Sequence, residues 1–165
     1  MMNVDLYLTK LVYNNREYYM LYIQDEKDRY LTDLNGNISF FTKKEEAMLY
    51  AETLNKTVID DDIVFSYPAD QCFLQNIDPI IALEFWNFFS DVAYSVGEKF
   101  WGDEKEDSIN NLYAKLFYAN NLPSIRGNGE LYIPEWKDHE KRLLQIIIDS
   151  GMQILTHQIE LFEKR

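Results

Sequence analysis

The sequence has a single cysteine, Cys72, which excludes an internal disulfide and argues against a disulfide-stapled secreted domain. It also lacks an uncharged apolar run of the roughly 18 residues that a membrane span needs. Its first residues show no basic segment followed by an apolar one, as an export signal would. We therefore expect a cytoplasmic protein of bacterial type with no membrane partner.

Basic residues are scarce as well. The chain carries 16 Lys and Arg against 28 Asp and Glu, which gives a net charge of −12. Nucleic-acid binding needs clustered cations for phosphate contacts, whereas the tight basic clusters here are only the pairs Lys43-Lys44, Lys141-Arg142 and Lys164-Arg165. We expect no nucleic-acid partner.

Glycine and proline are too few to form a linker, with six and four in 165 residues, and no internal repeat interrupts the chain. A length of 165 residues fits one domain, and 47% apolar residues are enough for a packed core. We predict a single domain over residues 1–165. Residues 1–67 are mainly strands plus one helix, and residues 78–165 are mainly helical.

The first 41 residues alternate apolar and polar side chains, as half-buried strands do. Turn signals at Asn14-Asn15 and Asn35-Gly36 divide them into two hairpins, which predicts a four-strand antiparallel meander. A capping box formed by Thr42 and Glu45 predicts a helix to about Leu54 that packs on one sheet face. The β-branched stretch 57–67 favours one more strand.

The second half has the periodicity of helices. Asp78-Pro79 opens a largely apolar helix that Gly97 closes, with a polar stripe at Glu84, Asn87, Asp91 and Ser95. Two more helices are predicted at about 107–120 and 134–162, the second bent or split at Ser150-Gly151. The expected fold class is α+β, an N-terminal antiparallel β-meander with one packed helix followed by a C-terminal group of three helices.

No catalytic motif names a reaction. The two histidines, His139 and His157, are predicted on one helix about 27 Å apart, too far to share a metal or an active site. The spacing of Gly127 and Gly129 indicates a turn rather than a phosphate-binding loop. We expect a non-enzymatic protein without cofactor or metal. A carboxylate-based hydrolase stays as an alternative, because 28 acids offer many pairs.

The negative charge is concentrated in the middle of the chain. The net charge is −2 over residues 1–56, −10 over 57–107 and 0 over 108–165, and the middle segment also holds 10 of the 25 aromatic residues. Acids around aromatic anchors are typical of a surface that binds a basic protein. The candidate partner-binding residues are Asp60, Asp61, Asp62, Tyr67, Glu84, Asp91, Trp101, Asp103, Glu104, Glu106 and Asp107.

In size, acidity, lone cysteine and α+β plan, the chain resembles small bacterial immunity proteins, a resemblance of overall character without a shared motif. The resemblance implies a tight one-to-one complex with a basic toxin such as a nuclease, a cytoplasmic location and no cofactor. Two alternatives stay open: a secretion chaperone or adaptor, which is commonly dimeric, and a mimic of the phosphate backbone of DNA. The oligomeric state is left open.

Overall fold

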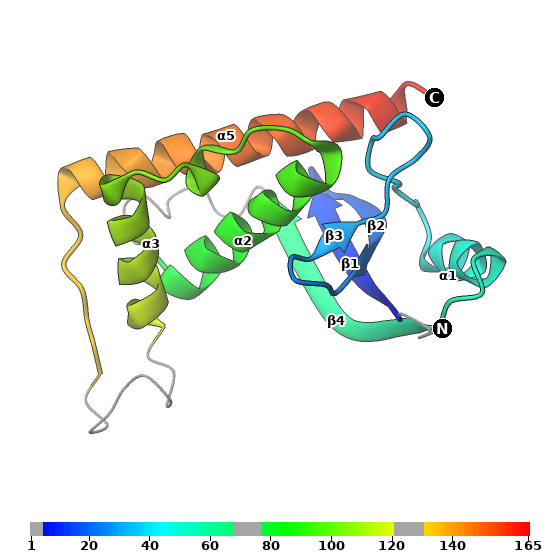
Figure 1. The fold of residues 1–165 in the computed structure, drawn as a ribbon, viewed down its shortest axis with the longest axis horizontal. Helices are drawn as coiled ribbons and strands as arrows, with labels where there is room; N and C mark the ends of the chain where they lie inside the picture. Colours follow the sequence, from blue (N-terminus) through cyan, green and yellow to red (C-terminus); the bar gives the residue numbers. More distant parts are fainter. Residues whose placement is uncertain (1–4, 68–76, 121–130) are drawn as a thin grey trace.

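The computed structural model describes residues 5–67, 77–120 and 131–165, so Cys72 and the turn at Gly127 and Gly129 lie outside the described residues. The predicted α+β class is confirmed (Figure 1). The strands are β1 (Leu6–Tyr13), β2 (Arg16–Ile23), β3 (Arg29–Tyr30) and β4 (Val58–Tyr67). The helices are α1 (Lys44–Thr53), α2 (Pro79–Val96), the short 3-10 helix η1 (Trp101–Asp103), α3 (Asp107–Ala119) and α5 (Asp138–Glu163).

The sheet has the order β3-β2-β1-β4 and is mixed rather than purely antiparallel. The hairpin of β1 and β2 is as predicted, and its two turn residues, Asn14 and Asn15, have positive φ angles of 49° and 64°. The expected fourth strand at residues 38–41 makes isolated bridges only. The fourth strand of the sheet is β4, parallel to β1. The antiparallel meander was therefore wrong in its last strand, while the strand predicted at 57–67 is confirmed.

The acidic triplet produces an irregularity in β4. Tyr7 pairs with Ile59 but Thr9 pairs with Ile63, so the register shifts across Asp60, Asp61 and Asp62. Asp62 has a φ of 54° there. Asp tolerates such backbone better than most residues, which explains why a polar triplet lies inside a strand.

Helix α1 covers one face of the sheet, with Ala47 and Ala51 buried against it. The predicted capping box is absent, because the helix starts at Lys44 and Lys43 makes no side-chain cap. Thr42 instead donates a hydrogen bond to the side chain of Glu46 at 3.3 Å. The burial of Ala47 and Ala51, and not an N-terminal cap, therefore attaches α1 to the sheet.

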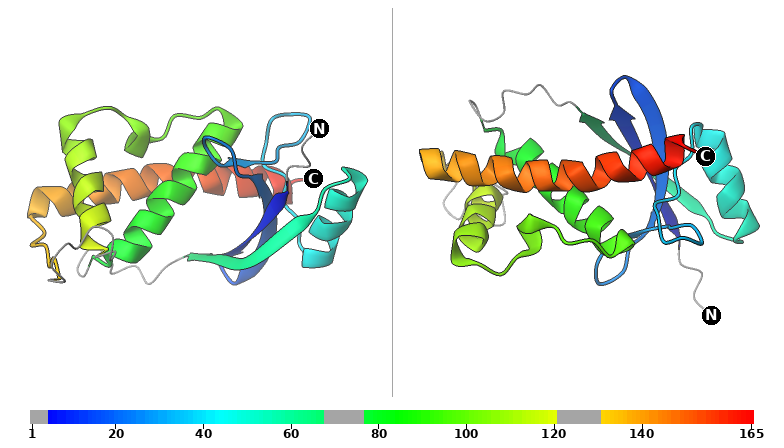
Figure 2. Two further views of the ribbon diagram at one scale, coloured as in Figure 1. Left: turned by 60° about the horizontal axis from the view of Figure 1, so that its bottom comes forward. Right: turned by 90° about the horizontal axis from the view of Figure 1, so that it is seen from above.

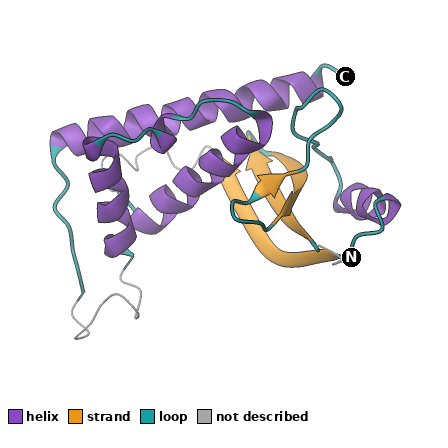
Figure 3. Cartoon of the chain, in the orientation of Figure 1, coloured by secondary structure: helices purple, strands orange, loops and turns teal. Residues whose placement is uncertain are grey.

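Helix α2 agrees with its sequence signals. The Asp78 carboxylate accepts hydrogen bonds from the backbone N–H of Ile80 and Ile81 at 3.0 and 3.3 Å, and Gly97 ends the helix with a φ of 73°. Together with α5, this helix covers the sheet face opposite α1 (Figures 2 and 3). The core there is rich in aromatic rings, including the stacked pair Phe65 and Phe88, whose centroids are 4.2 Å apart.

Helix α5 is continuous over 26 residues, so the predicted bend at Ser150-Gly151 was wrong. Gly151 serves packing instead. An added Cβ at this position would lie 2.3 Å from Phe89 Cγ, which means that α2 and α5 approach closely because Gly151 has no side chain. None of the helices in the three described ranges is long and apolar enough to cross a membrane.

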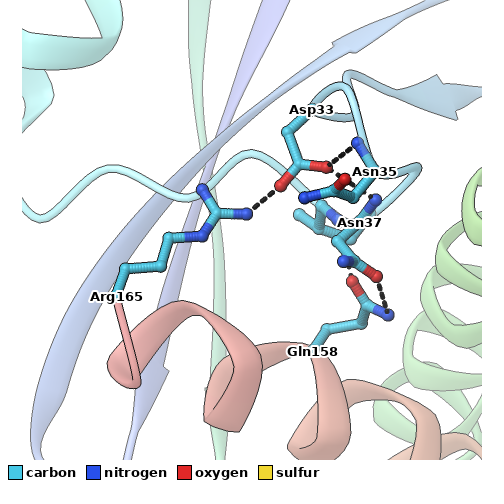
Figure 4. A network of polar contacts seen from close by, with 6 residues as sticks. Asp33, Asn35, Asn37, Gln158 and Arg165 are labelled. Carbon is cyan, nitrogen blue, oxygen red and sulfur yellow. Dashed lines mark hydrogen bonds and ion pairs between the residues drawn. The ribbon is translucent and has the colours of Figure 1, made fainter.

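The end of α5 anchors the turn between β3 and α1 (Figure 4). Gln158 is buried, accepts the backbone N–H of Ile38 at 2.8 Å, and donates to Asn37 Oδ1 at 3.3 Å. Asp33 accepts the backbone N–H of Asn37 at 3.1 Å and forms an ion pair with Arg165. The N–H of Ile38 thus bonds to a side chain of α5, while Ile38 and Phe41 pair with Thr32 and Tyr19 through isolated bridges.

Candidate functional site

The turn between β2 and β3 docks one lysine against α2 and η1. The Lys27 ammonium donates to Ser90 Oγ at 2.6 Å, and the Ser90 hydroxyl in turn donates to Asp103 Oδ1 at 2.6 Å. The ammonium also lies 5.6 Å from the centroid of the Tyr94 ring. We call Lys27, Asp28, Ser90, Asp91 and Asp103 the Lys27 junction.

The backbone beside the junction is fixed by a serine of the predicted polar stripe. Ser95 Oγ accepts the backbone N–H of Tyr30 at 2.8 Å and donates to the carbonyl of Asp91 at 2.6 Å. Tyr30 itself is buried and shares a hydrogen bond of 3.1 Å with Thr9 Oγ1. Burial raises the pKa of the Tyr30 hydroxyl far above its ordinary value. The hydrogen bonds of Ser95 and Thr9 to Tyr30 therefore fix the end of the turn that carries Lys27 and Asp28.

Negative charge exceeds positive charge within the junction. The pKa of Asp91 is raised to about 7, mainly by burial and also by the nearby carboxylates of Asp28 and Asp103, while Lys27 opposes the rise. Burial also raises the pKa of Asp28, again against the attraction of Lys27. A single ammonium thus faces three carboxyl groups, so the charge of the junction is not balanced by its own residues.

A cavity of about 500 Å³ opens beside the junction, with Lys27, Ser90 and Asp103 in its wall. Asp91 is not among the residues that line it. A carboxyl group with a pKa near neutrality would suit a general acid, but a catalytic acid must reach the bound substrate. The placement of Asp91 therefore does not favour the hydrolase alternative. In the described ranges, no group of three or more His, Cys, Asp or Glu side chains is arranged to hold a metal ion.

The structure brings together two of the acids predicted from sequence, Asp91 and Asp103. The other three acids of the segment 103–107 do not belong to the junction. Glu104 forms an ion pair with Lys99 at 3.5 Å, and the exposed Glu106 and Asp107 begin α3.

Trp101 lies in η1 and is 53% exposed. It borders a separate cavity of about 300 Å³ against α5. Trp101 is therefore accessible, but it lies in the wall of a different depression from that of Lys27.

The other predicted residues lie elsewhere. Asp60 forms an ion pair with Lys44 of α1, which lowers the pKa of the Asp60 carboxyl. Figure 1 shows the first half of β4 beside the N-terminal end of the sheet, whereas η1 lies along α5. The acidic segments 60–62 and 103–107 do not form one surface. Glu84 is exposed on α2. Tyr67 is the last residue of β4, where it pairs with Tyr13 of β1.

Sequence reasoning missed Lys27, Asp28 and Ser90. A signal for Lys27 was present, because it is a lone cation among Asp25, Glu26 and Asp28 in a turn. Ser90 is a small polar residue in a nearly apolar stretch of α2 and is 7% exposed. A buried hydroxyl needs a partner, but the sequence does not show that this partner lies 63 residues away.

Fold and site together define a small acidic α+β protein whose sheet is covered by helices on both faces and whose charged junction joins the turn between β2 and β3 to the helical half. No family model matches the chain, and no curated protein matches it. Among solved structures it is similar to the crystal structure of the SatS C-terminal domain in complex with bromine. That match has 11% sequence identity and a TM-score of 0.48, and it covers 96% of this chain and 91% of that chain.

Proposed function

We propose that the protein is an inhibitor that neutralises a basic toxin, such as a nuclease, by docking the Lys27 junction and the turn beside it against the toxin. The observation that carries this proposal is the unbalanced charge of the junction, where Asp28, Asp91 and Asp103 face one lysine. An arginine or lysine of a partner would supply the missing positive charge. Such complementarity steers association and rejects acidic partners.

The surroundings of the junction support a protein partner. Asp25, Glu26, Lys27, Arg29 and Tyr94 line a depression of about 570 Å³. Tyr94 is 54% exposed, and an exposed ring beside acids is the kind of anchor on which interface energy concentrates. Asp25 and Glu26 of this depression are exposed, and their negative charge would attract a basic partner at long range.

The test is affinity capture from the native lysate at low and high salt with matched variants. Asp28→Asn combined with Asp91→Asn removes charge at the junction, and Glu45→Gln combined with Glu52→Gln removes the same charge from exposed positions of α1. We expect one basic partner that the wild type and the α1 variant retain at low salt and that the junction variant loses. The isolated partner should be toxic, and co-expression of the wild type should restore growth.

Two results would count against the inhibitor. Retention of the partner by the junction variant would move the interface elsewhere, and a captured partner without toxicity would remove the inhibitory role. Because neutralising Asp91 relieves its buried charge, loss of binding in this variant is not explained by unfolding.

One observation favours the alternative of a secretion chaperone or adaptor. The side chain of Asn120 donates to the Pro79 carbonyl at 3.3 Å, so the end of α3 lies against the start of α2. Apolar side chains exposed near this contact are Ile80, Ile81, Phe117 and Tyr118. Light scattering separates the two functions: a stable dimer that binds an unfolded client supports the chaperone, and a monomer with one salt-sensitive partner supports the inhibitor.

A further inference from the structure

Trp86 of α2 has a buried hydrogen-bond donor without a partner. Its side chain is 2% exposed, and its Nε1–H makes no hydrogen bond within the described part of the chain. Indole nitrogen donates and cannot accept, and buried donors in folded proteins are nearly always bonded. The Trp86 N–H is therefore a position where an external acceptor would be stabilised.

This donor lies in the wall of the cavity of about 500 Å³ that adjoins the Lys27 junction. Gly102 of η1 stands next to it, and an added Cβ at Gly102 would lie 2.7 Å from Trp86 Nε1. The same Cβ would lie 2.5 Å from the ring of Phe100, so the absence of a side chain at Gly102 lets η1 pack closely against the indole. The volume falls within the roughly 300–1,000 Å³ typical of small-molecule sites.

The remaining wall supplies both donors and acceptors. Tyr113 O–H donates to Asn87 Oδ1 at 2.9 Å, which leaves the amide N–H groups of Asn87 directed to other acceptors. Asn110 lines the same cavity from α3 with an exposed amide, which offers one acceptor and two donors. The two charged residues in the wall, Lys27 and Asp103, have opposite signs. The wall thus favours neither an anion nor a cation.

We infer that this cavity binds a small, neutral, polyhydroxylated molecule of monosaccharide size, with one ligand oxygen accepting from Trp86 Nε1–H. Hydroxyl groups both donate and accept, so they match a wall in which an indole N–H, amides and a carboxylate alternate. An anionic ligand would meet Asp103 with Asp91 behind it, and a cationic ligand would meet Lys27.

The site goes beyond the proposed inhibitor function and does not depend on it, because it is measured on the protein alone. The chain has three tryptophans, so a proton–nitrogen NMR spectrum of the labelled protein shows three indole signals. The variants Trp101→Phe and Trp136→Phe assign the Trp86 signal by elimination. Glucose, galactose, mannose and N-acetylglucosamine are then titrated, with gluconate and glucosamine as charged counterparts.

We expect at least one neutral sugar to shift the Trp86 indole signal saturably while the other two indole signals stay in place. Asn110→Ala should weaken this binding about tenfold, the effect of one lost hydrogen bond, and Asn111→Ala, an exposed neighbour on α3, should not weaken it. Gly102→Ala, whose methyl group would press on Trp86 Nε1 and displace the donor, should abolish the shift, and the same spectrum reports whether the variant is folded.

Three results overturn the inference: a Trp86 signal that no neutral sugar moves, an equal response to gluconate or glucosamine, or equal binding by the Asn110 and Asn111 variants. None of them bears on the toxin proposal, since no protein partner takes part.

Discussion

Gly151 of α5 lies against the ring of Phe89 on α2, so close that a Cβ on Gly151 would stand 2.3 Å from Phe89 Cγ. Phe89 is 1% exposed, and its ring packs against those of Phe85, Phe88 and Phe100. We predict that Gly151→Ala lowers the free energy of unfolding by about 1–3 kcal/mol, because overpacking outweighs the gain of about 1 kcal/mol in helix propensity. Urea denaturation measures the change, with the exposed Gln153→Ala as control. A more stable Gly151→Ala protein would show that α2 and α5 are not in such close contact.

Asp91 should make the stability of the protein depend on pH. Its pKa is about 7 in the folded protein against 3.8 as the ordinary value. Because the folded state holds this proton more tightly, Asp91 stabilises the fold below about pH 4, and that contribution is lost as pH rises toward 7. Asp28, whose pKa is also raised, contributes in the same direction.

The variant Asp91→Asn should remove most of that dependence. At pH 8 we expect it to be more stable than the wild type by on the order of 1–2 kcal/mol, a value reduced for the partial solvent screening of a half-buried group. Thermal unfolding between pH 4 and pH 8 measures this, and Glu84→Gln on the same helix is the exposed control. Parallel pH profiles for wild type and Asp91→Asn would contradict the prediction.

Gln158 should be a strong single contributor to the attachment of α5. Its replacement by alanine leaves the N–H of Ile38 without its acceptor, which costs about 1–3 kcal/mol for a buried donor. Equilibrium unfolding in urea gives the magnitude, and amide hydrogen exchange at Ile38 should accelerate. Gln153→Ala, one exposed position on the same helix, should change neither quantity.

The first hairpin should depend on its second turn residue. Asn15 has a φ of 64°, so Asn15→Ala should lower the free energy of unfolding by about 1–2 kcal/mol, the cost of left-handed backbone for a residue with a Cβ. Asn15→Gly should be neutral or stabilising, since glycine accepts this conformation. The two variants differ by one methyl group, and equal stabilities would mean that the turn adopts another backbone geometry.

The elements that could be predicted are those defined by local chemistry. Asp78, Pro79 and Gly97 delimit α2 because caps act on the adjacent backbone. The last strand could not be predicted this way, since residues 38–41 and residues 57–67 both have strand-like sequences. The difference between them lies in long-range pairing: β4 pairs along the whole of β1, whereas residues 38–41 make only isolated bridges.

In the candidate site, too, local features could be predicted and long-range contacts could not. The polar stripe of α2 was recognised from its periodicity, and Asp91 and Ser95 lie where the turn of β3 meets the helix. The junction itself depends on Lys27 reaching Ser90 across 63 residues of chain. Charge counting placed the excess of acid in residues 57–107, which include Asp91 and Asp103 but not Asp28. It could not say which acids converge, because convergence is a property of the packed helices.

The place of α5 in the core has a consequence for synthesis on the ribosome. Leu144, Ile148 and Leu155 complete the core against α2 and the sheet, yet they are translated more than 100 residues after β1 and β2. Until they emerge, the aromatic face of the sheet lacks the part of its cover that α5 supplies, and the nascent chain exposes a β-rich apolar surface for several seconds at ordinary elongation rates. Chaperone binding to translating ribosomes should therefore peak while residues 60–140 are being made and fall once α5 has left the exit tunnel.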